Sequence, residues 1–305
     1  FFVMGSNAGS LSLDVARNHP VRLVESGPAA GVSIAAHYAR RLGLSNLLSF
    51  DMGGTTAKIA LVTDYEPTRT SELEVARVKR FQKGSGLLLK APAVDLIEIG
   101  AGGGSIARVD NLGLLTVGPD SAGSAPGPAC YGQGGRDATV TDANVALGFL
   151  NPDYFLGGNM PLDRERSVAA IDEHVGGPMG VATSQAASSI FEVVNDNMAN
   201  AAAVYAAEQG IDLRNYALLA FGGAAPAHAW DVARRLGIGE VRIPFATLGV
   251  TTPSAGTTWT MNLGREEYPL GPNKRHGQLV LSLWSPNLEA QSFHSRAAFG
   301  NLVFE

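Results

Sequence analysis

The run FDMGGTTAKI, residues 50–59, combines residue types that bind phosphate groups and a divalent cation. Its chemistry-bearing residues are Asp51, Gly53, Gly54, Thr55, Thr56 and Lys58. Paired glycines let the backbone approach a ligand and point amide groups at anionic oxygens, and threonine hydroxyls donate to the same oxygens. A carboxylate at the end of a strand can hold Mg²⁺ or Mn²⁺, directly or through water. The same pattern is also typical of a plain turn between two strands, so both alternatives stay open at this point.

A second glycine bend follows the apolar run YALLAF and precedes a helix-like segment. It consists of Gly222, Gly223 and Ala224. The start of a helix adds partial positive charge that favours an anion. Small-residue turns between a strand and a helix are common in α/β proteins, so this bend alone is weak evidence. The two bends together favour a nucleotide site, because phosphoryl transfer depends mainly on positioning and on neutralising charge.

Three further features are candidate parts of an active site. The glycine run in IGAGGGSIARVD is either an anion-binding or substrate-contacting loop, or a connector, and comprises Gly102, Gly103, Gly104 and Ser105. Asp142, in TVTDAN, is expected to cap a helix, with a substrate-facing role as the alternative. His228 follows the second bend and is either a catalytic base, a metal ligand or a partly exposed helix residue. With Asp51, these two residues are the candidate catalytic set.

Other polar or reactive residues have weaker patterns. Asp196, Asn197 and Asn200 interrupt an apolar helix, so they either line a site or face water. Cys130 has no CxxC partner, and an inert buried thiol is expected.

The elements that position these residues alternate between strands and helices, which favours an α/β fold with helices covering a sheet. Predicted strands are a strand end at 21–27, a hairpin at 47–63, a strand at 73–79, a strand before Gly222 and strands at 239–245 and 278–284. Predicted helices cover 28–43, 162–177, 184–210 and the segment after Pro226. Residues 82–139 are rich in Gly, Pro and Ser, and the strand-like pieces within them indicate ordered loops.

Composition excludes several classes of protein. The chain has 305 residues and a net charge of −5, which argues against a nucleic-acid partner. No run of about 18 apolar residues is present, so no membrane helix is expected. A single cysteine and the lack of a signal-peptide pattern favour a reducing, cytoplasmic location. The chain starts inside a strand-like run without Met, and we expect it to be a fragment or a processed piece.

Seven segments, taken in order, closely resemble the hydantoinase A/5-oxoprolinase family over about residues 1–262. They are ESGPAAGV, FDMGGTTAK, EIGAGGGSIARVD, VGPDSAGSAPGPACYGQGG, TVTDANVALG, NDNMANA and AFGGAAPAHA. We therefore expect a family domain at 1–262 and a tail or truncated region at 263–305.

The resemblance implies an actin-like, sugar-kinase-like ATPase fold with two RNase-H-like halves, here incomplete and carrying a glycine-rich inserted region. It further implies that residues 51–56 form a second phosphate loop and residues 222–224 an adenosine loop. The implied reaction is ATP-dependent opening of a cyclic amide such as a hydantoin or 5-oxoproline. Alternatives are a subunit of an ATP-dependent ketone carboxylase and a non-catalytic domain that binds a partner subunit. A hydantoinase B-type subunit or a homo-oligomer is the implied partner.

Two departures from the family pattern stand out. The family's D-M-G-G-T-S-T-D has an acid where this chain has Lys58, which could reach a phosphate or pair with a neighbour. The family's first phosphate loop, resembling D-x-G-G-T-F-T-D, does not occur in the chain. We therefore expect this chain to be the later portion of the enzyme.

Overall fold

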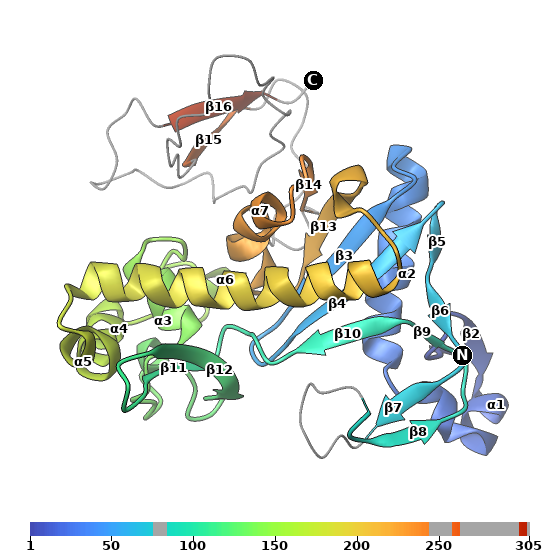
Figure 1. Ribbon diagram of the computed structural model, residues 1–305, viewed down its shortest axis with the longest axis horizontal. Coiled ribbons are helices and arrows are strands. Elements are labelled where there is room, and N and C mark those ends of the chain that lie inside the picture. The colour runs from blue at the N-terminus through green and yellow to red at the C-terminus, as the bar shows by residue number, and fades with distance from the viewer. Residues whose placement is uncertain (76–83, 244–257, 263–298, 304–305) are drawn as a thin grey trace.

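The computed structural model describes residues 1–75, 84–243, 258–262 and 299–303. Its centre is a mixed sheet (Figure 1), formed by β3 (Leu47–Met52), β4 (Ala57–Thr63), β5 (Glu66–Pro67), β10 (Leu96–Ile99), β13 (Ala217–Phe221) and β14 (Val241–Arg242). The strand order is β10-β4-β3-β13-β14, with β5 also paired to β4. β4 runs antiparallel to both β3 and β10, whereas β13 is parallel to β3 and to β14. The predicted hairpin at 47–63 and the α/β class are confirmed.

Helices cover both faces of this sheet. Helix α2 (Ser26–Leu42) packs on one face, and α6 (Thr183–Glu208) and α7 (Ala225–Arg235) pack on the other. Successive residues of β3 alternate between these layers, since Leu47 joins the α2 cluster and Leu48 the α6/α7 cluster. Burial on both faces explains why the β3 sequence is an almost continuous apolar run.

Helix α2 ends where the sequence predicts and begins slightly earlier. Gly43 caps it in the left-handed conformation at φ +67°, which glycine adopts without strain. Its first residue is Ser26, so the strand end predicted at 21–27 is wrong. Pro20 instead opens a 3₁₀ turn, η1 (Pro20–Leu23), because its fixed φ suits a helical first turn.

The long helix α6 begins in a second lobe and ends at the sheet (Figure 1). The second lobe contains α3 (Val140–Ala146), α4 (Arg164–Ile171), α5 (Gly177–Met179) and the hairpin of β11 (Ser105–Val109) and β12 (Leu115–Ser121). The single helix predicted at 162–177 starts at its N-cap Asp163 as α4. It then widens into a π turn, η4 (Asp172–Gly176), before α5. The remaining elements are β1 (Phe2–Met4), β2 (Ser10–Ser12), α1 (Leu13–Asn18), β6 (Arg69–Thr70), β7 (Leu73–Val75), β8 (Leu87–Leu89), β9 (Ala93–Val94), η2 (Ala129–Tyr131), η3 (Phe155–Gly158), η5 (Leu213–Asn215), β15 (Thr258–Asn262) and β16 (Phe299–Val303).

Some sequence predictions lie outside the described residues: the second half of the strand at 73–79, the end of the strand at 239–245 and the whole strand at 278–284. Strands β15 and β16 pair with each other across the boundary predicted at 262, and that boundary stays a prediction. Within the described ranges, no helix has both the length and the apolar character needed to cross a membrane.

Candidate functional site

The two glycine bends meet at the carboxyl ends of adjacent parallel strands. Phe221 of β13 pairs in register with Asp51 of β3, so the residues that follow each strand emerge side by side. The Ala224 amide then donates to the Met52 carbonyl, with an N···O distance of 2.9 Å. Carboxyl ends of parallel strands are where open α/β sheets bind ligands. The structure therefore brings together the two segments that the sequence selected.

The first bend is a tight tip between β3 and β4 whose backbone is open to solvent. The Gly53 amide donates to the Thr56 carbonyl at 3.0 Å and closes the tip. Gly54 and Thr55 at its apex are exposed. A Cβ added to Gly53 or Gly54 would meet no atom within 4 Å. The tip is thus open on the side where Gly53 and Gly54 lack a side chain, which leaves room for a phosphate group to approach.

The second bend needs glycine at its first position. Gly222 has φ +90°, and an added Cβ would collide with Asp51 Oδ1 and lie 2.6 Å from the Met52 carbonyl oxygen. At Gly223, an added Cβ would meet open space. The bend therefore packs against the Asp51 carboxylate at Gly222 and is open at Gly223.

The glycine run predicted to contact substrate is buried beneath the first bend. Gly102 to Ser105 are all buried. The Gly103 and Gly104 amides donate to the Gly53 and Gly54 carbonyls at 3.0 and 2.6 Å. A Cβ on Gly102 would lie 2.6 Å from the Thr55 amide nitrogen. This geometry favours a supporting role, and a direct substrate contact stays a prediction.

A row of charged side chains crosses three strands beside the bends. In register, Asp51 of β3 pairs with Lys58 of β4, which pairs with Glu98 of β10. Lys58 Nζ donates to Glu98 Oε1 at 3.1 Å and to Thr56 Oγ1 at 2.9 Å. The alternative in which Lys58 pairs with a neighbour is thus the one observed. We call Asp51, Lys58 and Glu98 the charge row.

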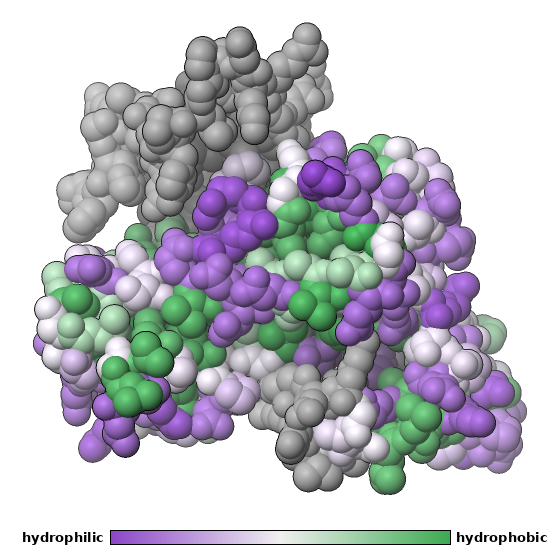
Figure 2. All heavy atoms as spheres, in the orientation of Figure 1, coloured by the Kyte–Doolittle hydropathy of each residue, from purple (hydrophilic) through white to green (hydrophobic). Residues whose placement is uncertain are grey.

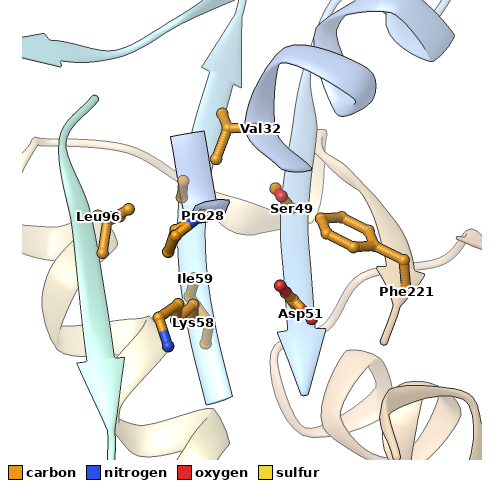
Figure 3. Close-up of a pocket in the computed structure, with 9 residues that line it drawn as sticks. Pro28, Val32, Ser49, Asp51, Lys58, Ile59, Leu96 and Phe221 are labelled. Carbon is orange, nitrogen blue, oxygen red and sulfur yellow. The ribbon is translucent and has the colours of Figure 1, made fainter. Parts of the chain in front are cut away.

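The charge row faces the start of helix α2. Figure 3 shows Pro28 and Val32 of α2 in front of β4, which carries Lys58, with Asp51 near the end of β3 and Phe221 reaching from β13 toward Ser49. The space enclosed there is about 10 Å³, enough for roughly one water molecule. Next to it is an open depression of about 440 Å³. Its lining consists of the charge row and Leu23, Glu25, Ser26, Gly27 and Pro28.

The charge on Asp51 is set by two opposing effects. Burial raises the pKa of this carboxyl group above its ordinary value, and the Lys58 ammonium group pulls the pKa back down. The described residues contain no cluster of three or more His, Cys, Asp or Glu side chains that could hold a metal ion. Mg²⁺ at nucleotide sites is usually held by one or two carboxylates together with phosphate oxygens, so a lone Asp51 fits that mode. Metal binding by Asp51 stays a prediction.

Asp142 is a fully buried carboxylate in the second lobe. It is the third residue of α3, whose N-cap is Thr139, so the expectation that Asp142 is itself the cap is wrong. Its oxygens accept hydrogen bonds from the Ala129, Cys130 and Thr139 amides and from the Thr139 and Ser167 hydroxyls. Because both oxygens are occupied by protein donors, the geometry supports a structural role. A catalytic role for Asp142 stays a prediction that this geometry does not favour.

His228 is also fully buried, in the first turns of α7. It therefore does not reach the bends as an exposed base, and a partly exposed helix residue is also the wrong expectation. Its ring contacts Asn144 of α3 and Asn195 of α6. Asp196, Asn197 and Asn200 are exposed on α6, which confirms the water-facing alternative for them.

Three positions of the candidate site and its surroundings are not predicted from the sequence. Glu98 is 40 residues from Lys58, and only its place in the alternating run VDLIEIG marks it as facing one side of a strand. Asn195 is the buried polar residue of α6, next to the three that the pattern selected. Ser26 and Gly27, at the start of α2, lie in the family-like segment ESGPAAGV and line the open depression beside the charge row. Cys130 is buried, as expected, and burial raises the pKa of its thiol, which favours an inert thiol.

The chain belongs to the hydantoinase/oxoprolinase family, whose model matches residues 1–260. Among curated proteins, it is 39% identical over 228 residues to the acetophenone carboxylase gamma subunit of Aromatoleum aromaticum, covering 74% of this chain. It is 38% identical over 245 residues to the caprolactamase subunit alpha of Pseudomonas jessenii, covering 80%. It is 35% identical over 242 residues to 5-oxoprolinase 1 of Arabidopsis thaliana, covering 73%.

Solved structures give the same result at the level of the fold. A nucleotide-free acetone carboxylase structure superposes with a TM-score of 0.69 at 30% identity, covering 86% of this chain and 36% of that one. The ATP-dependent caprolactamase of Pseudomonas jessenii superposes with a TM-score of 0.69 at 34% identity, covering 88% and 39%. The matched region spans 30%, 34% and 18% of the three curated relatives, so the chain covers about a third or less of their length.

Proposed function

We propose that this chain carries one half of the nucleotide site of an enzyme that uses ATP to open the C–N bond of a cyclic amide of the hydantoin or 5-oxoproline type. The observation that carries the proposal is the meeting of the two glycine bends at the ends of β3 and β13. Two relatives from this family act on lactam-type compounds by name, the caprolactamase and the 5-oxoprolinase.

We also propose that the central sheet is one RNase-H-like half of an actin-like ATPase fold. Its support is a five-strand path in which only the second strand is reversed, with helices on both faces. In such a fold, ATP lies in a cleft between two halves. A second half would therefore complete the cleft opposite the bends.

The proposed role of each bend residue comes from the family resemblance and is compatible with its geometry. Residues 54–56, of which Gly54 and Thr55 are exposed, bind phosphate oxygens, and the bend at 222–224, which is open at Gly223, lies against the adenosine part of the nucleotide. Asp51 holds Mg²⁺ or Mn²⁺, directly or through water. Lys58 neutralises charge next to Asp51 and holds the Thr56 hydroxyl in place. ATP bound there would supply the phosphoryl group for activation: its transfer to the ring carbonyl oxygen would release ADP. Attack of water on the carbon would then release phosphate and break the C–N bond, with the ring nitrogen leaving as a protonated amine or amide.

A carboxylase subunit is the second candidate, because the acetophenone and acetone carboxylases resemble this chain as closely as the caprolactamase does. The relatives named as gamma and alpha subunits also favour a partner subunit of hydantoinase B type. A third candidate is a domain that binds such a partner and turns over no substrate itself.

Turnover of ATP separates these candidates. The assay measures phosphate release with hydantoin, 5-oxoproline, caprolactam or a ketone plus bicarbonate, using a preparation that includes the partner subunit. Release stimulated by a cyclic amide supports the proposal, and release stimulated only by the ketone and bicarbonate overturns it. If a preparation that also contains the second half of the cleft fails to bind MgATP in calorimetry, only the non-catalytic candidate remains.

A further inference from the structure

A chain of buried polar side chains links three helices behind the bends. Asn195 Nδ2 of α6 donates to Asp231 Oδ2 of α7 at 2.9 Å, and Asn195 Oδ1 lies 2.8 Å from His228 Nδ1. On the other edge of the ring, His228 Nε2 lies 2.9 Å from Asn144 Nδ2 of α3. His228 also stacks on Phe191 of α6, with ring centres 4.9 Å apart. One imidazole thus contacts α3 and α6 from α7.

The direction of every hydrogen bond in this chain follows from Asp231. An ionised carboxylate only accepts, so Asn195 turns its amide group toward Asp231 and its carbonyl oxygen toward His228. His228 therefore carries its proton on Nδ1, and Nε2 accepts from Asn144. The Asn144 carbonyl oxygen is buried and has no partner in the part of the chain that the structure describes. The ring is neutral, because burial lowers the pKa of His228 to about 3 against the opposing effect of Asp231.

The same helices carry the contacts that hold the bends. Helix α7 directly follows the second bend, whose Ala224 amide is bonded to Met52. Near the start of α3, Thr141 bonds the Gly103 carbonyl through its amide at 2.7 Å and its hydroxyl at 2.8 Å. The Gly103 amide in turn donates to the Gly53 carbonyl at 3.0 Å. The connections form a closed circuit, which runs through Met52, Gly53, Gly103, Thr141, Asn144, His228 and Ala224.

We propose that His228 is a positioning residue, which closes this circuit and so fixes the two glycine bends relative to each other without touching the reacting atoms. This proposal shares one assumption with the proposed function, namely that the two glycine bends bind a nucleotide. It replaces a catalytic role for His228, since a neutral ring that is bonded at both nitrogens has no free site for a substrate proton.

The charged groups around the ring are paired elsewhere. Asp231 bonds Arg234 and Arg235, and Arg235 also bonds Glu192 and Asp196 of α6. Figure 2 shows a mainly hydrophilic surface over α6 and α7. On the α3 side, the Asp142 carboxylate is held by its own donors. The surrounding charged groups therefore leave the His228 ring neutral throughout the range from pH 5 to 9.

The first test compares His228→Phe and Asn144→Leu with the wild type in MgATP affinity and in turnover. Each variant removes hydrogen bonds from the circuit. A typical net value per bond predicts that the dissociation constant and the KM for ATP rise about three- to tenfold, while kcat changes less than about twofold. Asn197→Leu is the matched control, because Asn197 bonds Val117 of β12 outside the circuit. A hundredfold loss of kcat at unchanged KM would overturn the proposal, as would wild-type behaviour of both variants.

The pH–rate profile gives a second, independent reading. If His228 only positions the bends, the pH–rate profile of Asn144→Leu has the same acid and base limbs as that of the wild type. If one limb disappears in His228→Phe, His228 takes part in proton transfer and the proposal is overturned. If His228→Phe does not fold, the Asn144→Leu variant decides, because it leaves the ring in place.

Two measurements need no nucleotide, so they separate failure of this proposal from failure of the proposed function. Nitrogen NMR of the wild type should show a neutral His228 ring protonated on Nδ1 from pH 5 to 9. Hydrogen exchange at the Gly103 and Ala224 amides should be about three- to tenfold faster in Asn144→Leu than in Asn197→Leu. An Nε2-protonated ring, or equal exchange in the two variants, would refute the circuit even if MgATP binds.

Discussion

Replacing Gly222 by Ala tests whether the contact between the second bend and Asp51 is as tight as the structure shows. Gly222 has φ +90°, a conformation that residues with a Cβ rarely adopt. The new methyl group would also collide with Asp51 Oδ1 and crowd the Met52 carbonyl. Both effects act on the folded state, so the variant should be less stable and its Asp51 carboxylate displaced.

The expected size follows from these two effects. The backbone strain costs about 1–2 kcal/mol, and crowding in a packed region costs about 1–3 kcal/mol. Their sum is about 2–5 kcal/mol of unfolding free energy. In a domain of this size, such a loss lowers Tm by about 4–20 °C. If Asp51 moves by a large fraction of an ångström, ATP turnover should fall by about tenfold or more.

Gly223→Ala is the matched control, because an added Cβ there meets nothing within 4 Å and the residue does not have a positive φ. Denaturant unfolding and phosphate release are measured on both variants. Gly223→Ala should stay within about 0.5 kcal/mol of the wild type. Equal stability of the two variants would refute the close approach of Gly222 to Asp51.

Three further substitutions test the charge row and the second lobe. Asp51→Asn should abolish ATP turnover yet unfold at higher denaturant concentration at pH 7. Because folding raises the pKa of Asp51, the stability that this carboxyl group contributes is fully present below its ordinary pKa of 3.8 and is lost as the pH rises through its pKa in the folded state. The extra stability of Asp51→Asn should therefore vanish below pH 3.8. Lys58→Met should cost only about 0–1 kcal/mol of stability, since Glu98 is partly exposed, but it should move the acid limb of the pH–activity profile to higher pH. An unshifted limb would show that Lys58 does not govern Asp51. Asp142→Asn should destabilise by about 3 kcal/mol or more, measured by thermal unfolding, because amide hydrogens would face buried donors. A native-like Tm would count against a structural role.

The sequence predicts best where local chemistry and the core pattern agree. The β3–β4 hairpin has apolar runs on both sides of a glycine pair, and its partners are neighbours in sequence. Helix α2 ends at Gly43, where a left-handed residue is required. Both bends follow buried strands, so their placement at strand ends needed only the strand assignment.

Contacts between distant segments were not predictable in the same way. The glycines of the 102–105 loop allow it to pack closely against the Thr55 backbone. The sequence pattern of a glycine run does not distinguish a loop that is open to a ligand from one that is buried beneath another loop. His228 was selected because it follows a glycine bend, yet its environment is set by Asn144 and Asn195, 84 and 33 residues away. Burial reverses the chemistry expected of such a histidine.

The position of the second bend depends on strand register, and the register depends on packing far from the polar chemistry. Phe221 pairs with Asp51 and lies on the α2 face of the sheet. Its ring occupies the space above Gly31, where an added Cβ would lie 2.7 Å from a ring carbon. A shift of β13 by one residue would turn Phe221 to the opposite face and carry Gly222 away from Met52. The apolar contact between Phe221 and Gly31 is therefore one of the packing contacts that favour the register in which the two glycine bends meet.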